Sequence, residues 1–304
     1  MKPAEDHGPA RPKKSRSSQS KRAAAELAVD KTKAGEAGLI VGIGASAGGL
    51  GAFTTFLAAM PADSGMAFIL VQHLSPDHKS ILSDLLAKAT AMAVLEAQDG
   101  MRVDANHVFV IPPDSTLTVT NRRIHLSRPA PPRERRRPID SFFYSLAEDQ
   151  GENAICIVLS GTGTDGSLGL KAIKENGGLT IAQAEFDHTA MSGMPQSAAA
   201  TGLVDHVLPV EEIPAKVLEY RDHLRTVADH KDGDGIRSDA AAHLATITAL
   251  LRIKTDHDFS KYKEATIARR IQRRMQVLQI DWFRHTLNDC GRTSANPSCF
   301  SASF

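Results

Sequence analysis

The stretch LIVGIGASAGGL, residues 39–50, sets an apolar run directly against a turn of small residues. A short apolar run bounded by glycine is typical of a buried β-strand, and the amphipathic pattern that follows is typical of a helix. We therefore predict a strand over Leu39–Ile43, a helix over Gly49–Ala59 and a sharp turn between them.

The same alternation of apolar runs and amphipathic segments continues to about Leu224. Such alternation predicts an α/β fold: a doubly wound, mostly parallel sheet with helices on both faces. Thr116–Leu126 alternates apolar and polar residues around Asn121, which predicts an edge hairpin. Further strands are predicted over Ala67–Val71, Val108–Ile111, Ala154–Leu159, Leu179–Ala182 and Val204–Val207, and further helices over Ser80–Thr90, Ile139–Glu148 and Ser167–Glu175.

The composition excludes several classes of protein. The 304 residues hold 36 Lys and Arg against 35 Asp and Glu, so the chain is nearly neutral and we expect no nucleic-acid partner. Three cysteines (Cys156, Cys290 and Cys299) cannot build a disulfide framework, which favours a reducing, cytoplasmic location. The chain has no apolar signal core and no run long enough to span a bilayer, so we expect no direct membrane insertion.

The charge and hydropathy patterns divide the chain into five segments. Residues 1–36 are rich in Lys and Arg, lack apolar periodicity, and predict a disordered basic tail. Residues 37–225 form the α/β domain, and residues 226–245 form a linker. Residues 246–281 contain a basic amphipathic helix, a short helical C-terminal extension. Residues 282–304 have no helical period and are predicted to be an aberrant or disordered tail.

The turn after the first strand supports three interpretations. Gly42, Gly44 and Ala47 match the G-x-G-x-x-A pattern of dinucleotide-binding sites, but the second strand ends in a histidine where that site needs an acid. Alternatively, the small neighbours of Ser46 let the turn close and expose its hydroxyl as a nucleophile, much as in a nucleophile elbow. Ser46 would otherwise be a helix N-cap.

Two further residues decide between these interpretations. His73 ends the next strand and could act as a base for Ser46, although a lone histidine is often structural, and His78 is a competitor. Asp165 follows a buried strand in a glycine-rich loop, where it could orient the imidazole or cap the helix over Ser167–Glu175. Three such residues at one sheet edge favour a Ser–His–Asp hydrolase. The sequence shows neither H-E-x-x-H nor paired C-x-x-C spacing, so we expect no metal and no cofactor.

These motifs resemble the catalytic domain of the CheB-type chemotaxis protein-glutamate methylesterases. The resemblance runs from about Leu39 to Leu224 and implies that the catalytic serine, histidine and aspartate are Ser46, His73 and Asp165. It also implies hydrolysis of glutamyl methyl esters on the cytoplasmic helices of methylated chemoreceptors, deamidation of receptor glutamines in some members, and contact with other chemosensory proteins. The matching stretches are Gly44–Gly49, Val71–His73, Arg137–Asp140, Leu159–Gly166 and Met194–Pro195.

Several positions depart from that family. Thr162 stands where many members have Met, but a backbone N–H survives that change, so we expect activity to persist. Only the basic tail precedes Leu39, so control through an N-terminal receiver domain is expected to be absent. Phe259–Met275 resembles the start of a CheR-type receptor methyltransferase, as in proteins that fuse the two enzymes. The remaining chain is too short for a nucleotide-binding fold, which predicts a truncation or frameshift near Ile280–Trp282.

Two other functions stay open at this point. The domain could dock on chemoreceptors without hydrolysing anything, as a non-catalytic signalling module. Less directly, it could be a dinucleotide-binding oxidoreductase that uses the glycines of the first turn.

Overall fold

The structure is a computed structural model that describes residues 38–46, 48–72, 82–128, 137–184 and 193–229, with isolated positions between 244 and 267. All of these residues belong to one compact unit, Glu36–Phe304. The predicted basic tail, most of the predicted linker, most of the basic helix and all of residues 282–304 lie outside the described residues.

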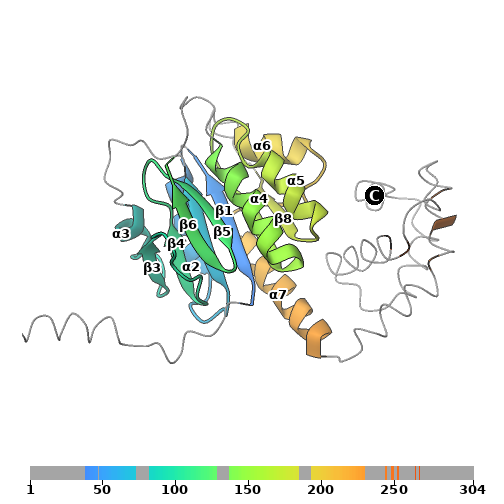
Figure 1. Ribbon diagram of the computed structural model, residues 1–304, viewed down its shortest axis with the longest axis horizontal. Coiled ribbons are helices and arrows are strands. Elements are labelled where there is room, and N and C mark those ends of the chain that lie inside the picture. The colour runs from blue at the N-terminus through green and yellow to red at the C-terminus, as the bar shows by residue number, and fades with distance from the viewer. Residues whose placement is uncertain are drawn as a thin grey trace, which may run out of the picture. The chain divides into compact units, whose positions relative to one another are not determined.

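The domain is built on a sheet of seven parallel strands (Figure 1). Strand β1 (Ile40–Ala45) lies at its centre and pairs with β2 (Ala67–Gln72) on one side and with β7 (Ala154–Val158) on the other. The remaining strands are β4 (His107–Val110) and β3 (Ala93–Glu96) beyond β2, and β8 (Leu179–Gln183) and β9 (His206–Leu208) beyond β7. The sequence therefore predicted the parallel α/β sheet correctly.

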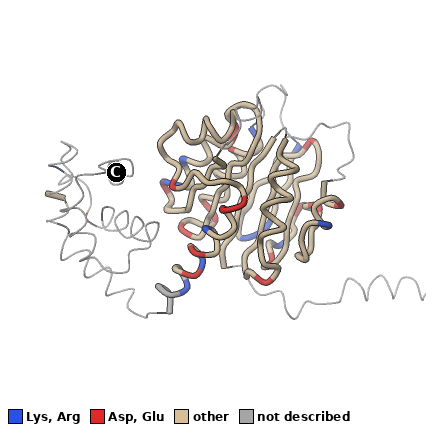
Figure 2. Tube along the Cα trace, turned by 180° about the vertical axis from the view of Figure 1, so that it is seen from behind, with Lys and Arg blue, Asp and Glu red and all other residues tan. Residues whose placement is uncertain are grey.

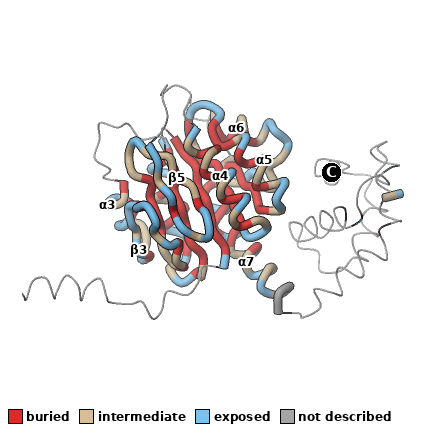
Figure 3. The backbone as a smooth tube through the Cα atoms, in the orientation of Figure 1, coloured by how far each residue is buried: buried red, intermediate tan, exposed pale blue. Residues whose placement is uncertain are grey.

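Helices cover both faces of this sheet, because most residues of its five inner strands are apolar and buried (Figure 3). One face packs against α2 (Gly49–Ala59), α3 (Leu82–Leu86) and α7 (Ile213–Asp229). The other packs against α4 (Pro138–Gln150), α5 (Ser167–Glu175) and α6 (Gly193–Ala200). The short 3-10 helix η2 (Gly151–Asn153) joins α4 to β7. Two hydrophobic clusters, one on each face, thus share the sheet between them.

The predicted hairpin forms, but it does not extend the edge of the main sheet. Strands β5 (Thr116–Thr120) and β6 (Arg123–Ser127) pair antiparallel as a two-stranded sheet of their own. Asn121 and Arg122, both at positive φ, form the turn, and their amides donate to the Asp149 carboxylate. The apolar side of the hairpin is buried in the same cluster as α4, which explains why it lies over a sheet face.

Helix α7 closes the domain and continues past residue 225, into the segment predicted as linker. Lys, Arg, Asp and Glu follow one another along it (Figure 2), and Lys216 pairs with Glu219 at 2.6 Å. Within the described part of the chain, no helix is both long enough and apolar enough to cross a membrane.

Candidate active site

Ser46 follows β1 at the carboxyl edge of the sheet, and its backbone is fixed from three directions. Its N–H donates to the Ser160 carbonyl at 3.1 Å, and its own carbonyl accepts from the Gly49 N–H at 2.9 Å and from Gln72 Nε2 at 3.1 Å. The residue is 6% exposed. Because the backbone groups are committed to β2, β7 and α2, the position of the side chain is set without using its hydroxyl.

The glycines of the first strand serve packing against α4. A Cβ atom on Gly44 would lie 2.4 Å from Ile139 Cγ2, and one on Gly42 would lie 2.7 Å from Phe142 Cε1. Both glycines lie within β1 and face this helix. Their lack of a side chain therefore admits α4 to the sheet, which argues against the interpretation of these glycines as a pyrophosphate cradle.

The loop between β7 and α5 returns across Ser46. A Cβ on Gly161 would lie 2.7 Å from Ser46 Cβ, 2.8 Å from Ser46 N and 2.6 Å from Met194 Sδ. The Met194 amide in turn donates to the Gly161 carbonyl at 3.0 Å. Ser46, Gly161 and Met194 therefore form one tightly packed contact. The spacing of residues in the sequence did not predict that Gly161 and Met194 pack against Ser46, although both lie in stretches that match the family.

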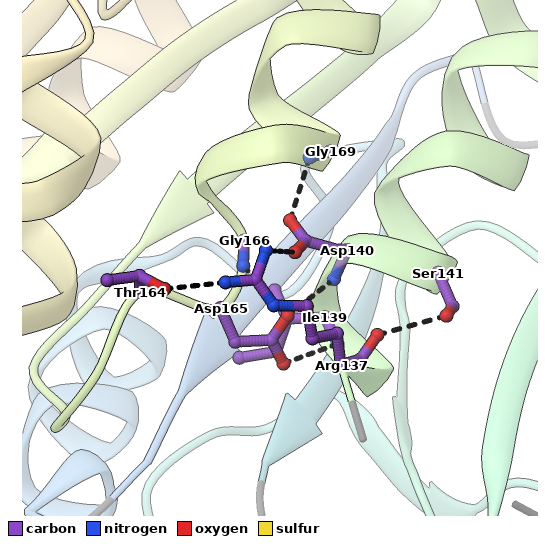
Figure 4. Close-up of polar contacts among 8 residues, drawn as sticks. All are labelled: Arg137, Ile139, Asp140, Ser141, Thr164, Asp165, Gly166 and Gly169. Atoms are coloured by element: carbon purple, nitrogen blue, oxygen red, sulfur yellow. Dashed lines mark hydrogen bonds and ion pairs between the residues drawn. The ribbon is translucent and has the colours of Figure 1, made fainter. Parts of the chain in front are cut away.

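Asp165 lies in the same loop and is 5% exposed. Its carboxylate accepts hydrogen bonds from the amides of Ile139 at 3.0 Å, Asp140 at 3.0 Å and Gly166 at 2.9 Å (Figure 4). The interpretation of Asp165 as the N-cap of the following helix is wrong, because the N-cap of α5 is Gly166, without a side-chain cap. Asp165 instead caps α4, whose first turn lies across the loop.

Arg137 and Asp140 surround that carboxylate. Arg137 donates through one terminal nitrogen to Asp140 Oδ2 at 3.0 Å and through the other to Thr164 Oγ1 at 2.7 Å. Asp140 Oδ1 accepts the Gly169 amide at 2.8 Å. Burial raises the pKa of the Asp140 carboxyl and the neighbouring Asp165 carboxyl adds to this, while the Gly169 amide and the Arg137 guanidinium oppose it.

The structure thus brings Ser46 and Asp165 to adjacent loops at one sheet edge. Ile139 connects them, because its side chain packs on Gly44 of β1 while its amide binds Asp165. The third predicted residue, His73, and its competitor His78 both lie outside the described residues. The arrangement of all three predicted catalytic residues therefore stays a prediction.

The other reactive groups of the same described ranges suit neither a metal site nor a nucleophile. No group of three or more His, Cys, Asp or Glu there could hold a metal ion. Cys156 lies inside β7 and is fully buried, as predicted. Burial raises the pKa of its thiol well above the ordinary value, with the Asp205 carboxylate adding to this, so it is no candidate nucleophile.

The fold defines the class of protein, a doubly wound α/β domain. Its candidate site lies at the carboxyl edge of the sheet beside β1, where the strand order runs to β2 on one side and to β7 on the other. Comparison with known proteins identifies the family. The CheB methylesterase family model matches residues 41–217, which is more than half of the chain. The chain belongs to the CheB methylesterase family.

Individual relatives agree with this assignment. Protein-glutamate methylesterase/protein-glutamine glutaminase 2 of Pseudomonas aeruginosa is 36% identical over 184 residues, which cover 59% of this chain and 52% of that protein. A Halobacterium salinarum enzyme of the same type is 34% identical over 190 residues, covering 58% and 52%. The crystal structure of the Thermotoga maritima CheB methylesterase catalytic domain has a TM-score of 0.55 at 30% identity, covering 60% of this chain and 98% of that one. The chain spans about half the length of these curated methylesterases.

A second family model matches near the C-terminus. The all-alpha domain of CheR methyltransferases matches residues 242–285, which overlap the segment predicted to be CheR-like. An uncharacterized 104.1 kDa protein of Rhodobacter capsulatus is 37% identical over 223 residues, which cover 66% of this chain but 23% of that protein. The two matched families in one chain are consistent with a methylesterase/methyltransferase fusion.

Proposed function

We propose that this chain is a protein-glutamate methylesterase that hydrolyses glutamyl methyl esters on chemoreceptors. The observation that carries the proposal is the placement of Ser46 on a backbone-fixed turn directly against the loop that holds Asp165. Membership in the CheB methylesterase family supports the same reaction class. The site residues are Ser46 as nucleophile, His73 as base and Asp165 as the orienting acid.

The reaction is an acyl transfer in two steps. Ser46 Oγ attacks the ester carbonyl while its proton passes to His73, and the methoxy group then leaves as methanol with that proton. Water attacks the acyl-enzyme next while its proton passes to His73. The bond between the acyl carbon and Ser46 Oγ then breaks, the glutamate product leaves, and His73 returns the proton to Ser46 Oγ. Asp165 holds the imidazole in one tautomer and stabilises the imidazolium. The N-terminus of α2 directs its positive dipole end at the turn, where oxyanion charge develops.

The substrate is a helical segment of another protein in this proposal. The partners are methylated chemoreceptor cytoplasmic helices, which sets the location as cytoplasmic, and other chemosensory proteins. The curated relatives are also named protein-glutamine glutaminases, so deamidation of receptor glutamines is a second reaction open to the same site. The CheR-like segment supports a place in a methylesterase/methyltransferase fusion.

Methanol release tests the proposal directly. The 304-residue chain and its Ser46→Ala variant are incubated with methylated chemoreceptor signalling domains, and methanol is measured over time. We expect release by the wild type and a loss of several orders of magnitude in the variant, with the free energy of unfolding changed by less than about 1 kcal/mol. Ser64→Ala, at the opposite edge of the sheet before β2, is the matched control and should keep wild-type release. Equal release by wild type and Ser46→Ala would exclude Ser46 as nucleophile.

A further inference from the structure

The loop over residues 161–166 reaches the candidate site at both of its ends. Gly161 packs against Ser46, and Asp165 binds the first turn of α4. The residues between them, Thr162, Gly163 and Thr164, are exposed. The Gly163 carbonyl accepts a hydrogen bond from the Ser197 hydroxyl of α6 at 3.3 Å. Thr164 lies between that bond and Asp165, and a change in its path would move Asp165 relative to Ser46.

One side chain ties this exposed part of the loop to α4. Arg137 immediately precedes the helix, and its guanidinium lies between Thr164 and Asp140 (Figure 4). Its two terminal nitrogens bind two acceptors that belong to different elements, at 2.7 Å and 3.0 Å. Asp140 then carries the link to the start of α5 through the Gly169 amide. The contacts close a ring around Asp165.

The ring is poorly explained as a stability device. The side chain of Arg137 is 42% exposed and that of Asp140 is 4% exposed, so the ion pair compensates a buried carboxylate. That compensation does not account for the second hydrogen bond, from Arg137 to the exposed Thr164. Its geometry instead suits a clamp. A planar guanidinium can donate to two separate acceptors at fixed angles, whereas a lysine ammonium is a single point of charge that cannot span both.

We propose that Arg137, Asp140 and Thr164 form a positioning unit that sets the orientation of the Asp165 carboxylate. Their role is positioning, because their contacts run to the loop and to the helix ends that hold Asp165. The inference rests on the proposed function, because it takes Asp165 as the acid that orients the catalytic base. Small misplacements of catalytic groups are costly, about 10²-fold for roughly 1 Å, which gives an exposed clamp a large effect on turnover.

Two shape-matched substitutions at Thr164 test the unit. Thr164→Val keeps the shape but removes the hydroxyl that binds Arg137, while Thr164→Ser keeps the hydroxyl. With methanol release from methylated receptor domains, we expect Thr164→Val to lower kcat by roughly ten- to a hundredfold at unchanged KM. Thr164→Ser should stay within about twofold of the wild type. Arg137→Lys should resemble Thr164→Val, and Arg123→Lys, on the hairpin, is the control that leaves kcat unchanged.

The outcomes separate the two proposals. Thermal unfolding of each variant is measured alongside, and unchanged midpoints together with the kcat loss would support the positioning role. Equal kcat for the wild type, Thr164→Val and Thr164→Ser would overturn the positioning unit and leave the methylesterase intact. A loss in both Thr164 variants, or a rise in KM alone, would also overturn it, because neither follows the hydroxyl. No release by the wild type would overturn the proposed function, and the positioning unit with it.

Discussion

The two strand-to-helix turns at the carboxyl edge of the sheet look alike but are held by different forces. Each enters its helix through a left-handed glycine, Gly48 at φ 85° before α2 and Gly166 at φ 92° before α5, and neither helix has a side-chain N-cap. The Ser46 turn is held by backbone hydrogen bonds and by close packing on Gly161. The Asp165 loop is held by hydrogen bonds to a carboxylate.

This difference follows from the chemistry proposed for each residue. A nucleophilic hydroxyl must stay available for the substrate, so its position has to be fixed through the backbone and through neighbours without side chains. A carboxylate that only orients a partner has several lone pairs, and the surplus can be bound by amides. The first turn is therefore sensitive to added volume and the second to lost charge.

Loss of charge at Asp165 should have the largest effect. In Asp165→Asn, the side-chain NH2 group replaces one of the two carboxylate oxygens and faces a backbone N–H. A buried donor is then left without an acceptor, which lowers the unfolding free energy by about 1–3 kcal/mol. Activity should fall by up to about 10⁴-fold, because the base loses its orienting acid. Urea unfolding and methanol release measure the two losses. Ser46→Ala should lose activity but keep its stability. An Asp165→Asn enzyme with wild-type activity and stability would contradict the proposed difference between the two turns.

Added volume at Gly161 should have the next largest effect. The new methyl group of Gly161→Ala would meet Ser46 N at 2.8 Å and Ser46 Cβ at 2.7 Å, and backbone at that distance cannot yield cheaply. We expect activity to drop by about 10²-fold and the unfolding free energy by about 1–3 kcal/mol. Gly163→Ala makes the comparison sharper: no atom lies within 4 Å of its new methyl group, so any effect there comes from its left-handed φ of 93°. Equal effects of the two variants would contradict a packing-held turn.

The pH dependence of stability gives the smallest effect. Because the folded-state pKa of Asp140 is raised above its ordinary value of 3.8, the folded protein binds more protons than the unfolded chain between those two values. The unfolding free energy should therefore fall as the pH rises through that window, by about 1.4 kcal/mol per unit of raised pKa, and stay reduced above it.

Asp140→Asn removes this titration. Urea unfolding from about pH 3.5 to about pH 7 should show the variant gaining stability relative to the wild type as pH rises. The charged groups that face Asp140 in the described structure are Asp165 and Arg137, and both remain in the variant. A stability difference that is constant over this range, or that shrinks with rising pH, would contradict the raised pKa.

Much of the site edge could be predicted because local patterns determine it. Apolar runs correctly predicted the strands that end near Ser46 and Asp165. The helices over Gly49–Ala59 and Ser167–Glu175 have the predicted bounds. Contacts between distant residues could not be predicted this way. Nothing local to Gly44 indicates that Ile139 fills the space beside it, and nothing local to Asp165 indicates that it caps α4.

The missed elements have physical reasons of their own. Strand β3 is four residues long, and its apolar residues follow closely on the segment predicted as a helix, Ser80–Thr90, with no glycine between them to mark a new element. The hairpin was predicted from its alternation, but alternation indicates only that one side is buried and not which surface buries it. The apolar side of the hairpin packs with α4, which a sequence pattern cannot distinguish from an edge position.

The capping of α4 by Asp165 also affects when the candidate site is completed as a newly made chain folds. Two of the three amides that bind the carboxylate lie 25 and 26 residues earlier in the chain, and the side chain of Ile139 packs on a strand nearly a hundred positions before it. Contacts over such separations form only after the intervening chain has been ordered, and they slow folding. The Ser46 turn depends on contacts over a still greater separation, because its amide binds the Ser160 carbonyl and Gly161 packs against it. Both turns would therefore be complete only after the central strands β1 and β7 have paired.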